Sequence, residues 1–185
     1  MIKFETKIIL LIVTIFSLPA YSYDRSSYRV WSDLDKNCKN TRIDVLEKRA
    51  IRINSISCTN INGTWIDYYT DKLITNESVI DLDHVIPLSY ADKIGASNWD
   101  IKTKRKFAND PDNLVITHRS INRQKGDKGL SKWLPIEFNV RCDYLLKWVH
   151  VINKYNLTLP NEDKVLLERY KPFCEKVSSA IIELE

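Results

Sequence analysis

Hydrophobic and polar positions divide the chain into an apolar beginning, a strand-rich middle and a helical end. The beginning is a nearly unbroken apolar run over residues 8–16. It is shorter than the roughly 20 residues that a membrane-spanning helix needs. Lysines precede it, and Ala20 and Ser22 follow at the positions that a signal peptidase reads. The pattern predicts a secretory signal peptide over residues 1–22, with a buried N-terminal helix as the alternative.

Two patterns follow this beginning. Apolar residues recur at helical spacing over residues 41–53, which predicts a surface helix with Thr41 as its cap. Residues 55–81 are rich in β-branched and aromatic side chains, and the pairs Asn62-Gly63 and Thr70-Asp71 interrupt them. This arrangement is typical of short strands joined by turns.

The end of the chain has helical periodicity. Apolar residues mark one helix face beyond Arg141 and a second stretch that reaches Leu184 and is interrupted at Pro172. No repeat, low-complexity tract or linker separates the parts of the chain. The sequence therefore predicts one domain over residues 23–185, with a helical part over about 139–185.

Because export is predicted, the four cysteines are expected to form disulfides. In an oxidising compartment, cysteines form disulfides more often than they stay free or bind metal, and the chain has no C-x-x-C pair. Three pairings are possible. We favour the pairing that is local in sequence, Cys38–Cys58 with Cys142–Cys174, although the sequence leaves the other two open.

Positive charge is concentrated in one segment. Removing residues 1–22 takes away two Lys and one Glu, so the formal net charge falls from +4 to +3. Between Lys102 and Lys132, nine Lys or Arg stand against three Asp, a balance of +6, so the rest of the mature chain carries −3. This concentration indicates contact with a polyanion. For residues 102–106 alone, a solvated helix face is an equally good interpretation.

Candidate chemistry lies at three places along the chain. Residues 81–87 read D-L-D-H-V-I-P, which puts carboxylates that suit a hard cation beside an imidazole that titrates near neutral pH. Asn113 lies 29 positions after His84, and Asn122 lies nine positions after Asn113. Each alone has an ordinary interpretation, as a strand end, a turn residue or a helix cap. Their order and spacing carry more information than any of them separately.

Four spaced blocks resemble a known nuclease family. They are D-x-D-H-V-x-P-L at 81–88, a block at 105–114 that contains F-A-N-D-P-x-N-L, N-x-x-K-G-D at 122–127, and W-L-P at 133–135. On these blocks the chain is identified as a member of the secreted HNH, or ββα-metal (His-Me finger), endonucleases, in a GmrSD C-terminal-like group. The likeness extends from about Trp31 to Cys174. It implies an α+β fold with a ββα-metal core over about residues 78–128, flanking helices and disulfides.

The resemblance also implies catalytic roles. His84 would be the general base that takes a proton from the attacking water. Asp83 and Asn122 would hold one divalent ion per site, Mg²⁺ or Mn²⁺, because carboxylate and amide oxygens suit hard cations. Asn113 would hold the loop or the histidine in place. Many family members have a histidine where Asn122 stands and carry paired zinc-binding cysteines that this chain lacks.

Basic residues within the matching blocks are candidates for nucleic-acid binding. Arg105 and Lys125 would contact phosphates, and Arg123 and Lys128, with Lys132, would add sequence-independent attraction. His118 matches neither ligand position and is expected to be a surface or DNA-facing residue. His150 is expected to be structural.

The sequence thus predicts a secreted or periplasmic, metal-dependent, nonspecific endonuclease that cuts DNA and leaves 5′-phosphate and 3′-hydroxyl ends. RNA is an open second substrate. The alternative is a catalytically silent module on the same fold that binds a polyanion or a protein partner. A zinc hydrolase is disfavoured because no H-E-x-x-H spacing is present. No membrane partner is expected after signal cleavage, and a toxin role would require an inhibitor or immunity protein.

Overall fold

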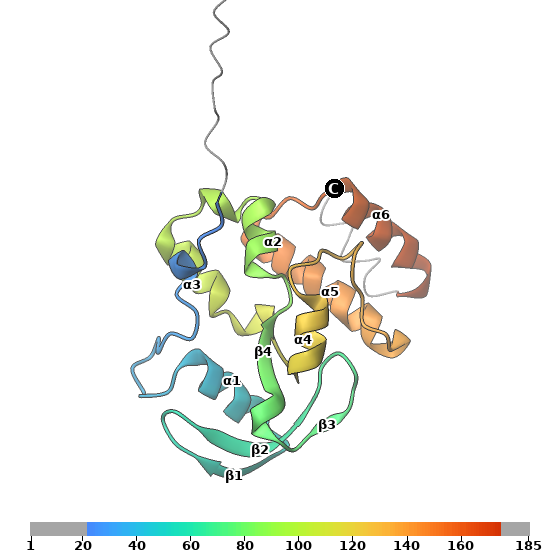
Figure 1. Cartoon of the computed structure of the whole chain (residues 1–185). Coiled ribbons are helices and arrows are strands. Elements are labelled where there is room, and N and C mark those ends of the chain that lie inside the picture. Colours follow the sequence, from blue (N-terminus) through green and yellow to red (C-terminus); the bar gives the residue numbers. More distant parts are fainter. Residues whose placement is uncertain (1–21, 175–185) are drawn as a thin grey trace, which may run out of the picture.

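The computed structural model describes residues 22–174, so the predicted signal peptide up to residue 21 and the chain beyond Cys174 lie outside the described residues. The helices are α1 (Thr41–Arg49), α2 (Leu88–Lys93), α3 (Ile101–Ala108), α4 (Arg119–Lys125), α5 (Phe138–Tyr155) and α6 (Asn161–Tyr170). The strands are β1 (Arg52–Ile56), β2 (Ile61–Ile66), β3 (Leu73–Ile74), β4 (Ile80–His84) and β5 (Leu114–His118). The predicted α+β class is confirmed, and Figure 1 shows how the elements are arranged.

Helix α1 begins where the sequence predicts but ends earlier. Its cap is Asn40, whose side chain accepts from Ile43 N, whereas the Thr41 hydroxyl donates to Ser32 O at 2.7 Å. The helix stops at Arg49 because the residues that follow form β1 against β2. The last residues of the predicted helix therefore belong to strand β1 instead.

Strands β1, β2 and β3 form an antiparallel sheet in that order. The predicted turn at Asn62-Gly63 is wrong, because both residues lie within β2. A Cβ on Gly63 would come within 2.3 Å of Arg52 O, so the glycine allows two strands to approach closely. The turn lies instead around Ser57 and Asn60. The predicted turn at Thr70-Asp71 is confirmed and joins β2 to β3.

Strands β4 and β5 form a separate antiparallel pair, called here the β4–β5 hairpin, whose long connection over residues 85–113 contains α2 and α3. Ile80 lies opposite His118, and His84 lies opposite Leu114. Helix α4 follows β5 directly and lies beside β4 (Figure 1). Alternate side chains of a strand point to opposite faces. Ile80 and Leu82 of β4 therefore pack into a core cluster with α1 and β2, while the other face is turned toward α4.

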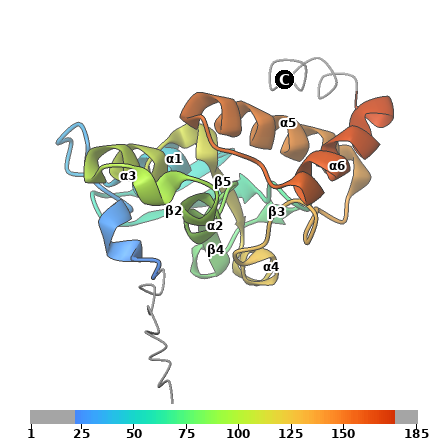
Figure 2. The same ribbon diagram turned by 90° about the horizontal axis from the view of Figure 1, so that it is seen from above.

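A second, larger core cluster involves the C-terminal helices, and Val85 and Val115 of the hairpin region belong to it. The predicted helical character is confirmed for α5 and α6, which lie together at one end of the molecule (Figure 2). The β4–β5 hairpin thus contributes residues to both clusters. No helix within residues 22–174 is long and apolar enough to cross a membrane.

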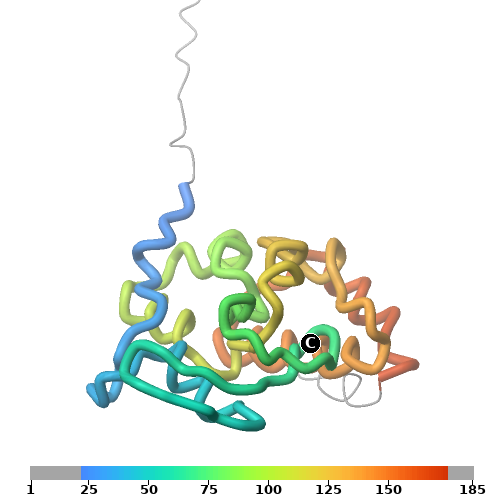
Figure 3. The backbone as a smooth tube through the Cα atoms, turned by 60° about the horizontal axis from the view of Figure 1, so that its bottom comes forward, coloured from blue at the N-terminus to red at the C-terminus, as the bar shows by residue number. Residues whose placement is uncertain are grey.

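Both expected disulfides are present. Cys38 is bonded to Cys58, and Cys142 to Cys174, so the pairing that the sequence favoured is confirmed. The first bond ties the segment before α1 to the β1–β2 turn, and the second ties α5 to the end of the described chain. Figure 3 shows the N-terminal segment running along one side of the molecule before it reaches α1 and the sheet.

Candidate active site

Two carboxylates of β4 face helix α4. Asp81 and Asp83 are two positions apart, so their side chains share one face of the strand. Asn122 donates from Nδ2 to Asp81 Oδ2 at 3.1 Å, and Lys125 lies 2.8 Å from Asp83 Oδ2. The structure therefore pairs Asn122 with Asp81, a residue to which the sequence prediction gave no role. Strand alternation in the D-x-D pattern is the signal that identifies it.

Asp83 is held by a buried polar network. Its Oδ2 atom accepts from the Tyr69 hydroxyl at 2.7 Å and from the fully buried Lys125, which also donates to His84 O at 2.7 Å. Burial lowers the pKa of Lys125, while the Asp83 charge opposes that shift. Burial and Asp83 together raise the pKa of Tyr69, so its hydroxyl stays a donor. Both donors fix the direction of the carboxylate.

The place of Lys125 corrects one prediction. The sequence suggested that Lys125 contacts a phosphate, but its side chain has no exposed area and its ammonium group is used by Asp83 and His84. A buried carboxylate without a partner would destabilise the fold, and Lys125 supplies the partner charge for Asp83. Lys125 is thus placed to position the site, and a bound phosphate cannot reach it in this arrangement.

His84 is buried, with 5% of its surface exposed, and its ring is oriented by one hydrogen bond. Nε2 lies 2.8 Å from Ala108 O. Because a carbonyl oxygen can only accept, this contact assigns the proton to Nε2 and leaves Nδ1 as the basic nitrogen. Burial lowers the pKa of His84 to about 4, against the opposing effects of Ala108 O and Asp83. The imidazole is therefore neutral near pH 7, as a proton acceptor must be.

Asn113 holds the turn that follows β4. Its side chain accepts from Ile86 N at 2.8 Å and donates to Ile86 O at 3.3 Å, and its backbone oxygen accepts from Val85 N at 2.8 Å. The side chain is fully buried. These contacts lie immediately after His84, on the loop that the sequence prediction connected with Asn113.

The other predicted basic residues differ in exposure. Arg123 and Lys128 are exposed, on α4 and just beyond it. Arg105 is half-buried and donates from Nε to Ser32 Oγ at 3.0 Å, so it is turned toward the N-terminal segment. Arg119, which was not among the predicted site residues, lies 3.5 Å from Asp81.

The remaining histidines stand apart from this network. His118 caps α4 by accepting from Ser120 N at 3.1 Å. His150 lies on the exposed side of α5 at 3.1 Å from Asp112. His118 is half-buried, whereas the His150 side chain is 57% exposed.

The oxygen donors of the site fit a hard divalent cation. Asp83 uses Oδ2 for its two donors, which leaves Oδ1, and Asn122 uses Nδ2 toward Asp81, which leaves its carbonyl oxygen. Such donors suit Mg²⁺ or Mn²⁺ better than zinc. Within residues 22–174, no group of three or more His, Cys, Asp or Glu is arranged to hold a metal. A cation held by Asp83 and Asn122 would therefore need water and phosphate to complete its shell.

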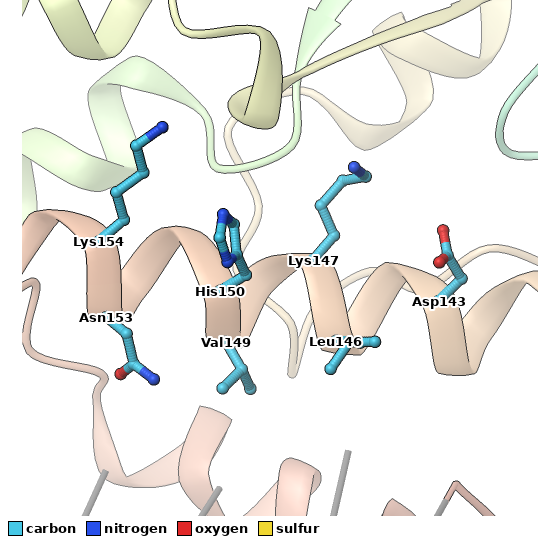
Figure 4. A pocket seen from close by; sticks show the side chains of 7 residues that line it. All are labelled: Asp143, Leu146, Lys147, Val149, His150, Asn153 and Lys154. Atoms are coloured by element: carbon cyan, nitrogen blue, oxygen red, sulfur yellow. The ribbon is translucent and has the colours of Figure 1, made fainter. Parts of the chain in front are cut away.

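A wide groove lies elsewhere, along α5, with a volume of about 650 Å³. Figure 4 shows Lys147, His150 and Lys154 on one side of the helix and Leu146, Val149 and Asn153 on the other. None of the residues expected to catalyse or to bind metal lines this groove.

The sequence matches a nuclease family across most of its length. The model of the GmrSD restriction endonucleases, C-terminal domain, matches residues 35–168, which include β4, β5 and α4. The chain belongs to this GmrSD C-terminal domain family. A protein of Arthroderma benhamiae described as an uncharacterized secreted protein is 33% identical over 152 residues, which cover 80% of this chain and 74% of the relative. No solved structure matches the chain. GmrSD family membership makes this a nuclease-like protein, with nucleic acid as the substrate class that the family name implies.

Proposed function

We propose that this protein is an exported, metal-dependent endonuclease that hydrolyses phosphodiester bonds of DNA, with β4, β5 and α4 as a ββα-metal core. The observation that carries the proposal is the neutral imidazole of His84, with Nδ1 as its basic nitrogen, next in sequence to a carboxylate that α4 holds in place. The GmrSD family match supports nuclease chemistry, and the secreted relative supports export.

In the proposed reaction, His84 Nδ1 accepts a proton from the water that attacks phosphorus. Ala108 O keeps the other ring nitrogen protonated, so Nδ1 is available for this task. Lys125 and Tyr69 hold Asp83 in one direction, and Asn113 fixes the turn after His84. When bound by Asp83 and Asn122, Mg²⁺ or Mn²⁺ would neutralise charge on the scissile phosphate and the departing 3′ oxygen.

Substrate binding is proposed to depend on the phosphate backbone. Arg123 and Lys128 are exposed on and after α4, within the segment of concentrated positive charge. Phosphate contacts hold a duplex without reading its sequence. If about four to six phosphates are neutralised, log affinity should fall by roughly 0.9 per contact for each tenfold rise in salt.

Plasmid degradation by the oxidised protein spanning residues 23–185 tests the proposal. Cleavage is expected with Mg²⁺ or Mn²⁺, and neither EDTA-treated protein nor Asn122→Ala at low Mg²⁺ should cleave at the wild-type rate. A parallel assay with RNA establishes whether the substrate class is wider. Cleavage that persists in EDTA would overturn the metal assignment. Salt-sensitive DNA binding without cleavage under any divalent ion would favour a silent polyanion-binding module.

A further inference from the structure

Trp31 lies flat against the ring of His84. The two ring centroids are 5.6 Å apart and the ring planes differ by 15°. Trp31 is half-buried, and its backbone has φ of +57°, the left-handed region. Bulky side chains rarely adopt this conformation, so the surroundings must hold Trp31 in it.

A single buried amide holds the backbone on both sides of Trp31. Asn109 is 2% exposed; its Nδ2 donates to Arg29 O at 3.0 Å, and its Oδ1 accepts from Ser32 N at 2.9 Å. Ser32 O in turn accepts from both the backbone nitrogen and the hydroxyl of Thr41 at the start of α1. The left-handed turn is therefore fixed by hydrogen bonds from two other elements.

The same short segment controls the histidine in two ways. Ala108 O accepts a hydrogen bond from Nε2 of His84, and the next residue, Asn109, holds the backbone beside Trp31 so that its indole stacks on the ring. The hydrogen bond fixes one edge of the imidazole, whereas the stacked indole fixes its plane. With both constraints the direction of Nδ1 is set before substrate arrives, as efficient proton transfer requires.

We propose that Trp31 is a positioning residue for His84, which sets the plane of the catalytic imidazole by stacking on it. This inference rests on the proposed nuclease function and adds to it a residue in the N-terminal segment. The residue stacks on the base, and its indole N–H is too weakly acidic to take part in the proton transfer.

Steady-state kinetics on a short DNA duplex with Mg²⁺ tests this role. Trp31→Ala and Trp31→Leu are expected to lower kcat by about tenfold or more, because small misplacements of a reacting group are costly, and to leave KM near the wild-type value. Trp31→Phe keeps a flat ring and should restore most of kcat. The matched control is Trp99→Ala, because Trp99 is also half-buried but packs on Phe107 and Tyr155. Equal kcat for Trp31→Leu and Trp31→Phe, or an equal loss in Trp99→Ala, would overturn the proposal.

A second measurement does not depend on activity. The chain has three histidines, so ¹⁵N NMR of the imidazole rings can be assigned with His84→Gln. In the wild type, His84 should give the signals of one tautomer with the proton on Nε2; in Trp31→Leu these should broaden or shift toward averaged values. Unchanged His84 signals in a folded Trp31→Leu would overturn the positioning role and leave the nuclease proposal standing. If the wild type cleaves nothing while these signals do change, the nuclease proposal fails and the contact between the two rings is upheld.

Discussion

The site on β4 and the groove on α5 each contain a histidine, and they differ in almost every other respect. His84 is 5% exposed and is fixed by a backbone carbonyl, whereas the His150 side chain is 57% exposed and pairs with Asp112 at the surface. The groove has a volume of about 650 Å³ and is lined by polar and apolar residues of α5, two of which are lysines. The site on β4 has several buried, mutually paired polar groups.

The proposed site and the groove on α5 therefore lie at different places in this molecule. Charged and polar groups are buried only when partners or a function retain them, so a fully buried lysine paired with a carboxylate is more informative than an open groove.

The largest expected effect is a difference in kcat between variants of the two histidines. His84→Ala should lower kcat for plasmid cleavage by about 10²- to 10⁴-fold, because the general base is lost. His150→Ala removes a ring of the same kind from the groove and should keep the wild-type kcat. Initial nicking rates of supercoiled plasmid with Mg²⁺ measure both. A comparable loss in the two variants would break the comparison.

The next effect concerns the lysines of the two regions. Lys125→Met should lower the free energy of unfolding by about 3–5 kcal/mol, because Asp83 would stay buried without its partner. Lys147→Met in the groove should change it by less than about 1 kcal/mol, since surface charges contribute little. Urea unfolding of the oxidised proteins measures the difference. Similar stability for both variants would mean that the Lys125 pair is dispensable.

The disulfides allow the site and the C-terminal helices to be loosened separately. Replacing Cys38 and Cys58 with Ser should lower the free energy of unfolding by about 3 kcal/mol. Replacing Cys142 and Cys174 should lower it slightly more, because the second disulfide closes a longer loop. Only the first disulfide includes a cysteine of the segment that carries Trp31, namely Cys38, so only its loss should lower kcat at temperatures where both variants are folded. Thermal unfolding followed by kinetics at 15 °C checks both statements. An equal fall in kcat would show that the C-terminal helices also support the site.

The smallest effect is the pH dependence of stability due to His84. The pKa of His84 is about 4 in the folded protein and about 6.5 when exposed, so the unfolded chain binds a proton first as pH falls. The free energy of unfolding keeps its full value above pH 6.5 and falls as the pH decreases toward 4, by about 3 kcal/mol at most. Urea unfolding of wild type and His84→Gln in EDTA, at pH 7.5, 5.5 and 4.5, isolates this contribution. A stability difference that does not change with pH would contradict the neutral, buried histidine.

Local patterns and spaced blocks predicted much of this architecture. The turn at Thr70-Asp71 and the C-terminal helices followed from local composition and periodicity. The disulfide pairing was the favoured one of three that the sequence left open. Gly63 was misplaced because Asn-Gly is a common turn, while its use within a strand depends on the distance to Arg52 across the sheet. Such a distance is a tertiary property that the local pattern does not contain.

The site shows the same division. The sequence brought His84, Asp83, Asn113 and Asn122 into one hypothesis through their spacing. It assigned Lys125 to phosphate contact because the residue lies within a matching block, and such a block does not show whether a side chain is buried. The pairing of Asn122 with Asp81 depends on which turn of α4 meets which residue of β4, and this register is set by packing.

The position of the β4–β5 hairpin has a consequence for partly folded forms of the chain. Its side chains complete both hydrophobic clusters, so neither cluster closes fully around the hairpin without the other. A fragment or folding intermediate that has formed only one of the two clusters would not hold His84 in its native position. Under the proposed function, activity should therefore be found only in chains in which both clusters have formed.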